Sequence, residues 1–266
     1  MAMSQKLETQ NLVSQKQIHH RESFLDNIAQ KLGRPRQIEP VERPALKHTC
    51  HQEVMAGLSS DELKELLINY TRTALGAHAV ETTQANLTKN LTEVCNKFCH
   101  DEDSETADSS SSDPAVNETI LSADPRLLAL VDIKQLTNDN HAVHVWDQNA
   151  GYEPNICIAE RAKAGVVFAE QALAESGTMV LYSNPAQGRA ISLLPEASVF
   201  VVPQSALVAR LTQATATLHD KARNGERIPS CVNFISGPSS TADIELIKVV
   251  GVHGPVYATY VIINDM

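Results

Sequence analysis

The sequence predicts an α/β fold, in which a mixed, mostly parallel sheet is flanked by helices on both faces. From residue 118 onward, short apolar runs alternate with segments of helical periodicity, and this alternation is typical of parallel sheets. Residues 231–235 form an apolar run that stops at the loop SGPSST, as a buried strand would. Asn-Pro and Gly within residues 184–188 predict a hairpin, and therefore some antiparallel pairing.

The expected elements follow the chain in order. After a polar tail at 1–20, apolar residues at helical spacing predict a helix at 23–32, which Gly33 ends. Three prolines between residues 34 and 49 predict an extended arm. The further expected helices lie at 60–75, at 86–98, from 125 onward, at 155–164 and at 205–223. The expected strands lie at 80–82, 119–121, 143–146, 165–169, 178–182, 190–194, 198–202, 231–235 and 256–263.

We therefore expect an N-terminal helical extension with a proline-rich arm over residues 1–50, and an α/β domain over residues 51–266. The net charge is −10, and residues 101–113 contribute six carboxylates and no basic residue. An acidic, serine-rich loop is expected at 101–114, and a chain without a basic face is not expected to bind nucleic acid.

The irregular cysteine spacing and the lack of a recognisable signal peptide predict a cytoplasmic protein. The five cysteines are irregularly spaced and follow no signal peptide, which favours a reducing compartment. No apolar run reaches the length of a membrane span.

The loop after the strand at 231–235 is the strongest candidate for a binding site. Ser240 and Asp243 match a capping box, so a helix is expected to start there, and its backbone N–H groups would favour an anion at the carboxyl ends of the strands. The alternative is a pair of well-formed turns with capping hydroxyls and nothing bound. The candidate ligand-binding residues of this stretch are Ser236, Gly237, Ser239, Ser240, Thr241, Asp243, His253 and Gly254.

Two upstream segments add further candidates. Glu175 lies in a loop before a strand, where its carboxylate can act as a base, a nucleophile or only a cap for backbone N–H groups. Arg189 follows a turn glycine, where a guanidinium can bind a phosphate or carboxylate or can simply be exposed. These segments contribute Glu175, Ser176, Gly177, Thr178, Gly188 and Arg189.

No metal site or cofactor is expected. Cys95, Cys99 and His100 are grouped, but no second cysteine cluster completes a zinc site. Iron–sulfur spacings and the G-x-G-x-x-G pattern of nicotinamide and flavin proteins are absent from the sequence. No residue is assigned a catalytic role.

Five segments in order resemble one protein family: RESFLDNIAQKLGRPR, AESGTMVL, GRAISLLP, ERIPSCVNFISGPSSTADIE and GVHGP. They resemble the LUD-domain family, in its lactate utilisation protein C group, over residues 21–265. The resemblance implies a Rossmann-like fold related to ribose-5-phosphate isomerases and CoA transferases. It further implies a cytoplasmic, non-redox component of a system that oxidises L-lactate to pyruvate, with two iron–sulfur subunits as partners, and we expect it to bind a small anionic ligand.

Two other functions stay open. The chain can be a free-standing transferase- or isomerase-like enzyme for a phosphorylated or CoA-linked metabolite, using Glu175 or His253. It can also be a scaffold that docks through its N-terminal helix and arm. The acidic loop departs from what the resemblance leads us to expect, and it touches none of the matching segments.

Overall fold

The computed structural model describes residues 19–39, 44–45, 47–99, 117–242 and 247–266. The chain divides into two compact units, Met1–Thr49 and Cys50–Met266. In the first unit, helix α2 (Arg21–Lys31) carries exposed apolar side chains at Phe24 and Ile28, as the helical spacing predicted. The tail at 1–18 and the acidic loop at 101–114 lie outside the described residues.

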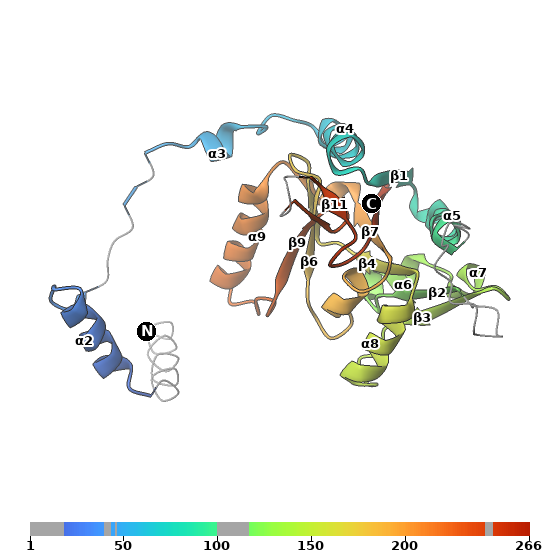
Figure 1. The fold of residues 1–266 in the computed structure, drawn as a ribbon. Coiled ribbons are helices and arrows are strands. Elements are labelled where there is room, and N and C mark those ends of the chain that lie inside the picture. The colour runs from blue at the N-terminus through green and yellow to red at the C-terminus, as the bar shows by residue number, and fades with distance from the viewer. Residues whose placement is uncertain (1–18, 40–43, 46, 100–116, 243–246) are drawn as a thin grey trace. The chain divides into compact units, whose positions relative to one another are not determined.

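The second unit is built from helices and strands in alternation (Figure 1). Its described helices are α3 (Cys50–Glu53), α4 (Ser60–Tyr70), α5 (Leu87–Cys99), α6 (Pro125–Leu130), α7 (Ile133–Leu136), α8 (Tyr152–Arg161), α9 (Leu211–Arg223), the π-helix η1 (Thr71–Leu75) and the 3₁₀ turns η2 (Gln84–Asn86), η3 (Arg189–Ser192) and η4 (Gln204–Ala206). Its described strands are β1 (His78–Thr82), β2 (Asn117–Leu121), β3 (His141–Val145), β4 (Ala164–Phe168), β5 (Gln171–Leu173), β6 (Thr178–Tyr182), β7 (Ala197–Pro203), β8 (Leu207–Val208), β9 (Val232–Ser236), β10 (Ser240–Thr241), β11 (Val249–Val250) and β12 (Tyr257–Ile263).

The described strands form three sheets. A six-stranded sheet has the order β1-β12-β7-β4-β2-β3, and every neighbouring pair in it is parallel. A four-stranded sheet, in the order β8-β5-β6-β9, carries antiparallel pairs between β5 and β6 and between β6 and β9. The third is the β10–β11 hairpin. The predicted α/β fold with a mostly parallel sheet is therefore confirmed.

The core lies on both faces of the six-stranded sheet because alternate strand residues point to opposite faces. In β7, Phe200 and Val202 belong to one core cluster, which also contains α4, α8 and the second sheet. Val199 and Val201 belong to the other cluster, with α5, α6 and α7. All seven residues of β7 are buried, as expected of a strand covered on both faces.

Local signals in the sequence account for several boundaries. Helix α4 begins at a capping box, in which the Ser59 side chain accepts from the Glu62 N–H and the Glu62 carboxylate accepts from the Ser59 N–H. Helix α6 begins with Asp124 as its N-cap and Pro125 in its first turn, as predicted. Strand β6 spans the predicted residues 178–182.

Three predicted elements are wrong. Residues 190–194 do not return as a strand, because they fall in and after η3, while β6 pairs with β5 and β9 instead. The helix expected at 205–223 begins only at Leu211, because residues 207–208 form β8 and pair with β5. The helix expected at Ser240 is replaced by β10, whose residues pair with β11.

Candidate functional site

The structure brings two of the predicted loops together through one buried tyrosine. The Tyr260 hydroxyl donates to the Gly177 carbonyl at 2.6 Å and accepts from the Gly237 N–H at 2.7 Å. Tyr260 lies in β12 and is fully buried, and burial raises the pKa of its phenol well above the ordinary value. The phenol therefore stays protonated and holds the loops before β6 and after β9 in one arrangement.

A chain of hydroxyl groups connects the same two loops. The Thr178 hydroxyl lies 2.7 Å from the Ser176 hydroxyl and 2.6 Å from the Ser236 hydroxyl. Thr178 and Ser236 are direct cross-strand partners in the β6–β9 ladder. Three predicted site residues thus form one hydrogen-bonded chain, although Ser236 lies 58 positions after Thr178 in the sequence.

Most residues of the predicted loop line one cavity, which we call the serine hollow. It has a volume of about 330 Å³, and its polar lining comes from Ser192, Ser198, Ser236, Ser239, Ser240 and His253, with Gly237 and Gly254 beside them. Gly254 permits close packing there, since a Cβ at this position would lie 3.2 Å from the Ser239 Cβ. Residues from η3, β7, β9, β10 and the turn before β12 therefore meet at one place.

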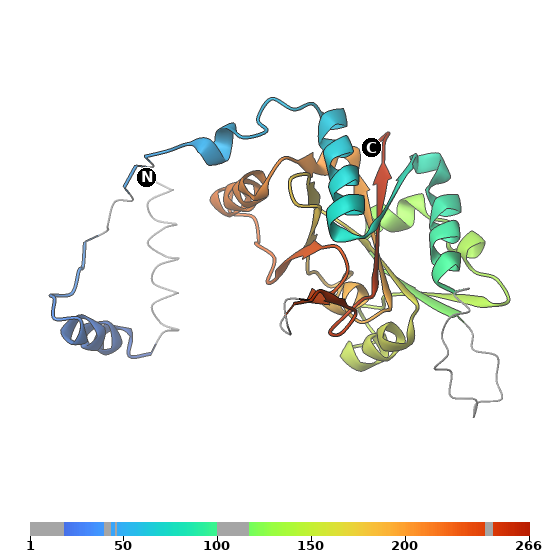
Figure 2. The same ribbon diagram turned by 45° about the horizontal axis from the view of Figure 1, so that its top comes forward.

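The serine hollow differs from the expected anion site in two respects. Its described residues include no helix N-terminus, because Ser240 and Thr241 are in β10. The N–H groups of Gly237 and Ser239 already donate to Tyr260 and to the Pro255 carbonyl. It also lies beside the start of β12, and not at the carboxyl ends of the parallel strands. In Figure 2, β12 runs up to the C terminus and the hairpin lies near its lower end.

The remaining predicted residues lie outside this hollow. Glu175 is paired with Arg210 at 2.6 Å, so its carboxylate is engaged at the surface. Gly188 packs under Trp146, where a Cβ would lie 2.2 Å from the indole ring. Arg189 is exposed and lines a smaller depression that shares Ser192 with the serine hollow. Asp243 lies outside the described residues.

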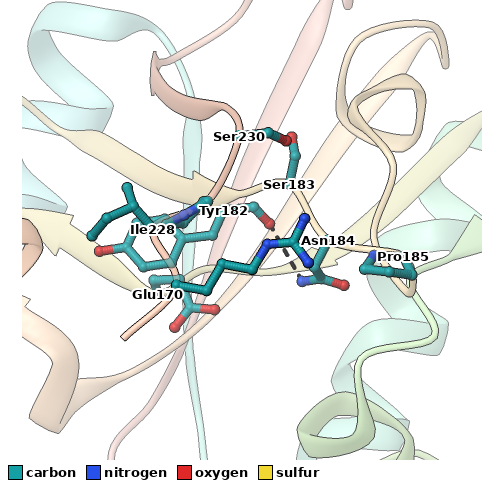
Figure 3. A pocket seen from close by; sticks show the side chains of 9 residues that line it. Glu170, Tyr182, Ser183, Asn184, Pro185, Ile228 and Ser230 are labelled. Atoms are coloured by element: carbon teal, nitrogen blue, oxygen red, sulfur yellow. Dashed lines mark hydrogen bonds between the residues drawn. The ribbon is translucent and has the colours of Figure 1, made fainter. Parts of the chain in front are cut away.

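Sequence reasoning missed a second cavity, which we call the glutamate hollow (Figure 3). It has a volume of about 520 Å³ and lies where β4 and β6 end and β9 begins. Its lining residues include Glu170, Tyr182, Ser183, Asn184, Arg227 and Ile228. Figure 3 shows the Glu170 carboxylate beneath the Tyr182 ring. This position, outside the carboxyl end of a parallel strand, is where ligands bind in open α/β sheets.

An ion-pair network, of which only the Asp124 side chain is buried, fixes the Glu170 carboxylate. Arg126 donates from two nitrogens to Glu170, at 2.9 and 2.5 Å, and also binds Asp124 at 2.7 Å. The guanidinium lies 4.5 Å from the centre of the Phe168 ring. Burial of Asp124 opposes its ionisation, but the hydrogen bonds from Arg126 outweigh this effect and lower the pKa of the carboxyl. The carboxylates of Asp124 and Glu170 thus share the one guanidinium of Arg126. Its single positive charge balances only one of their two negative charges.

The tyrosine in the glutamate hollow stays neutral. Burial raises the pKa of Tyr182 above its ordinary value, and the Glu170 carboxylate raises it further. The phenol is therefore a hydrogen-bond donor at neutral pH.

Two signals in the sequence point to this second cavity. Glu170 directly follows the strand predicted at 165–169, and a residue in this position lies at the carboxyl end of its strand. The segment ERIPSC places Arg227 shortly before the strand predicted at 231–235. Neither signal shows that the two segments meet, because that depends on the pairing of β6 with β9.

Within the described ranges, no group of three or more His, Cys, Asp or Glu residues is placed to hold a metal ion. No helix in the same ranges is long and apolar enough to cross a membrane.

Comparisons with known proteins agree with this architecture. Residues 68–263 match the family model described as LUD domain. The chain is 41% identical to Lactate utilization protein C of Geobacillus sp. (strain WCH70) over 93% of this chain and 97% of the relative. It is 38% identical to Lactate utilization protein C of Bacillus subtilis (strain 168), over 93% and 98% of the two chains. It is also 42% identical to Escherichia coli (strain K12) protein YkgG, over 92% and 99%.

A solved structure shows the same fold. It is the crystal structure of a DUF162 family protein from Deinococcus radiodurans, with a TM-score of 0.51 and 18% identity, covering 77% of this chain and 99% of that one. The family model covers most of the second unit, and the relatives match nearly end to end. The chain belongs to the LUD domain family.

Proposed function

We propose that this chain is the non-redox component of a system that oxidises L-lactate to pyruvate in the cytoplasm, together with two iron–sulfur subunits. Relatives named Lactate utilization protein C support this role, because they match more than nine-tenths of this chain and of their own length. The partners and the division of labour follow from the family resemblance of the sequence.

Within this role, the serine hollow binds a small carboxylate. The observation that carries this assignment is that five serines and His253 line one cavity of about 330 Å³. The hydroxyls of Ser192 and Ser198 donate to backbone carbonyls, whereas within the described residues no hydrogen bond engages the hydroxyls of Ser239 and Ser240, which are the donors left for a ligand. Hydroxyl groups donate to carboxylate oxygens, and a hydrogen bond to a charged group contributes roughly 1.5–3 kcal/mol. A cavity of this size accommodates a small metabolite.

The residues behind the hollow orient its lining. The Ser236 hydroxyl is held by Thr178, and Gly237 is held by Tyr260. Fixed hydroxyls bind more tightly than mobile ones because less conformational entropy is lost when the ligand arrives. Ser176, Gly177 and Thr178 therefore act as support for the site, with Arg189 at its margin.

Calorimetric titration with L-lactate, pyruvate and inorganic phosphate tests the binding site. The double variant S239A/S240A should weaken binding of the tightest of these probes at least about tenfold. The control S205A, at an exposed serine outside the hollow, should leave the Kd unchanged. Equal affinity of S239A/S240A and the wild type, or the absence of binding by all three compounds, would exclude the assignment.

Growth tests the role itself. A bacterial strain that lacks this chain should fail to grow on L-lactate as its carbon source and should grow normally on pyruvate, the expected product. Normal growth on both compounds would contradict the role in lactate use, whatever the outcome of the binding experiment.

A further inference from the structure

We infer that the glutamate hollow is a second ligand site, and that its ligand is a hydroxylated metabolite with a phosphate or carboxylate group. This inference does not depend on the proposed function of the serine hollow, because the two cavities share no lining residue.

The first argument is a fixed hydrogen-bond acceptor. The Glu170 carboxylate lines the cavity while two nitrogens of Arg126 hold it in place. Arg126 is itself fixed by Asp124, whose side chain is only 5% exposed. A carboxylate that is fixed in this way needs no reorganisation to accept hydrogen bonds from hydroxyl groups of a ligand.

The second argument is a cation without a protein partner. Arg227 lines the same cavity, and within the described part of the chain no hydrogen bond or ion pair engages its guanidinium. Other arginines of this unit, such as Arg126, Arg161 and Arg210, are each paired with a glutamate. A free guanidinium donates two parallel hydrogen bonds to both oxygens of a carboxylate or to two oxygens of a phosphate.

The third argument is a buried hydroxyl that lacks a partner. The Ser183 Oγ is buried at the wall of the cavity and has no hydrogen-bond partner in the described residues. Buried polar atoms are normally paired, so such an atom indicates a group that a bound molecule can satisfy. The Tyr182 phenol, which is protonated at neutral pH, lies at the same wall as a further donor.

These groups define the class of ligand. The ligand's anionic group meets Arg227 and the neutral donors of Ser183 and Tyr182, and its hydroxyl groups donate to Glu170. Its carbon skeleton lies against Ile228 and Pro185, which give the cavity apolar surface. The volume of about 520 Å³ falls in the usual range for metabolite and cofactor sites, roughly 300–1,000 Å³.

The test compares matched probes on the purified full-length chain by calorimetry. Glycerol 3-phosphate and D-glycerate carry hydroxyl groups, whereas propyl phosphate and propionate have the same anionic groups without them. At millimolar concentrations, at least one hydroxylated probe should bind and should bind more tightly than its hydroxyl-free analogue. The phosphate and carboxylate pairs decide which anion the site takes.

Variants assign the contacts. R227Q should weaken binding of the tightest probe at least about tenfold, because a charge-assisted contact is lost. The control R223Q removes an exposed arginine at the end of α9 and should leave the Kd unchanged. E170Q should reduce the advantage of the hydroxylated probe over its analogue. S183A, which leaves the Arg126 network intact, should weaken both members of the pair.

Several results would overturn the inference. They are the absence of binding by all four probes, equal affinity for a hydroxylated probe and its analogue, and equal affinity of R227Q and the wild type. An equal loss in R223Q and R227Q would also overturn it, because general charge attraction would then explain the binding. The titrations are repeated in the variant S239A/S240A, in which binding of small carboxylates at the serine hollow is weakened. Binding that remains in this variant and is lost when R227Q is added belongs to the glutamate hollow, so failure of either site is detected separately.

Discussion

Replacing Tyr260 with Phe should destabilise the second unit and loosen both loops of the serine hollow. The substitution removes one hydroxyl that donates to the Gly177 carbonyl and accepts from the Gly237 N–H. Both glycines are buried, so neither backbone group gains water as a replacement partner. Each of the two backbone groups left unsatisfied costs roughly 1–3 kcal/mol. Part of this cost is offset, because folding of the variant no longer removes a phenol hydroxyl from water. We therefore expect the free energy of unfolding to fall by about 2–4 kcal/mol.

Urea unfolding at equilibrium measures this effect. The midpoint of Y260F should fall at an unchanged m-value, because the two native states bury nearly the same surface. The control Y257F removes a phenol that makes no hydrogen bond in the described residues and should change the free energy of unfolding by less than about 0.5 kcal/mol. If Y260F were as stable as Y257F, the Tyr260 bridge would not hold the two loops, and this reasoning would be refuted.

Two further predictions use other parts of the second unit. G188A should shift the fluorescence emission of Trp146, the single tryptophan, to longer wavelength, because the new Cβ displaces the indole ring. The control G57A, at a glycine with open space around it, should leave the spectrum unchanged. An unshifted spectrum in G188A would contradict the packing of Gly188 under Trp146. The pKa of Asp124 is lower in the folded chain than in the unfolded chain, so its ionised carboxylate stabilises the fold when the pH is above the unfolded pKa. This contribution to the free energy of unfolding is lost as the pH falls below about 4. The difference in unfolding free energy between the wild type and D124N should therefore shrink under acid; a difference constant from about pH 7 to about pH 3 would show that Asp124 ionisation does not stabilise the fold.

Local signals in the sequence were sufficient for most of the fold. The apolar run at 178–182 and the Asp124–Pro125 start of α6 depend on neighbouring residues only, and the structure has both. The predicted helix at Ser240 failed because a capping box is also a short polar stretch that can pair as a strand. Pairing with Val249 and Val250 decides between the two, and the sequence pattern does not contain it.

The candidate sites were predictable only in part, for the same reason. The loops at 175–178 and 236–241 were recognised separately, but it is the pairing of β6 with β9 and the buried Tyr260 of β12 that connect them. The glutamate hollow was missed because Glu170 and Arg227 come from segments that meet through strand pairing across the second sheet. Long-range contacts of this kind leave no periodic pattern in the sequence.

The central claim is that this chain is a required component of a lactate-oxidising system. The most direct measurement is L-lactate-dependent reduction of a dye under anaerobic conditions, with this chain alone, with the two iron–sulfur subunits alone and with all three together. We predict activity only in the complete mixture. Full activity of the two iron–sulfur subunits without this chain would contradict the claim.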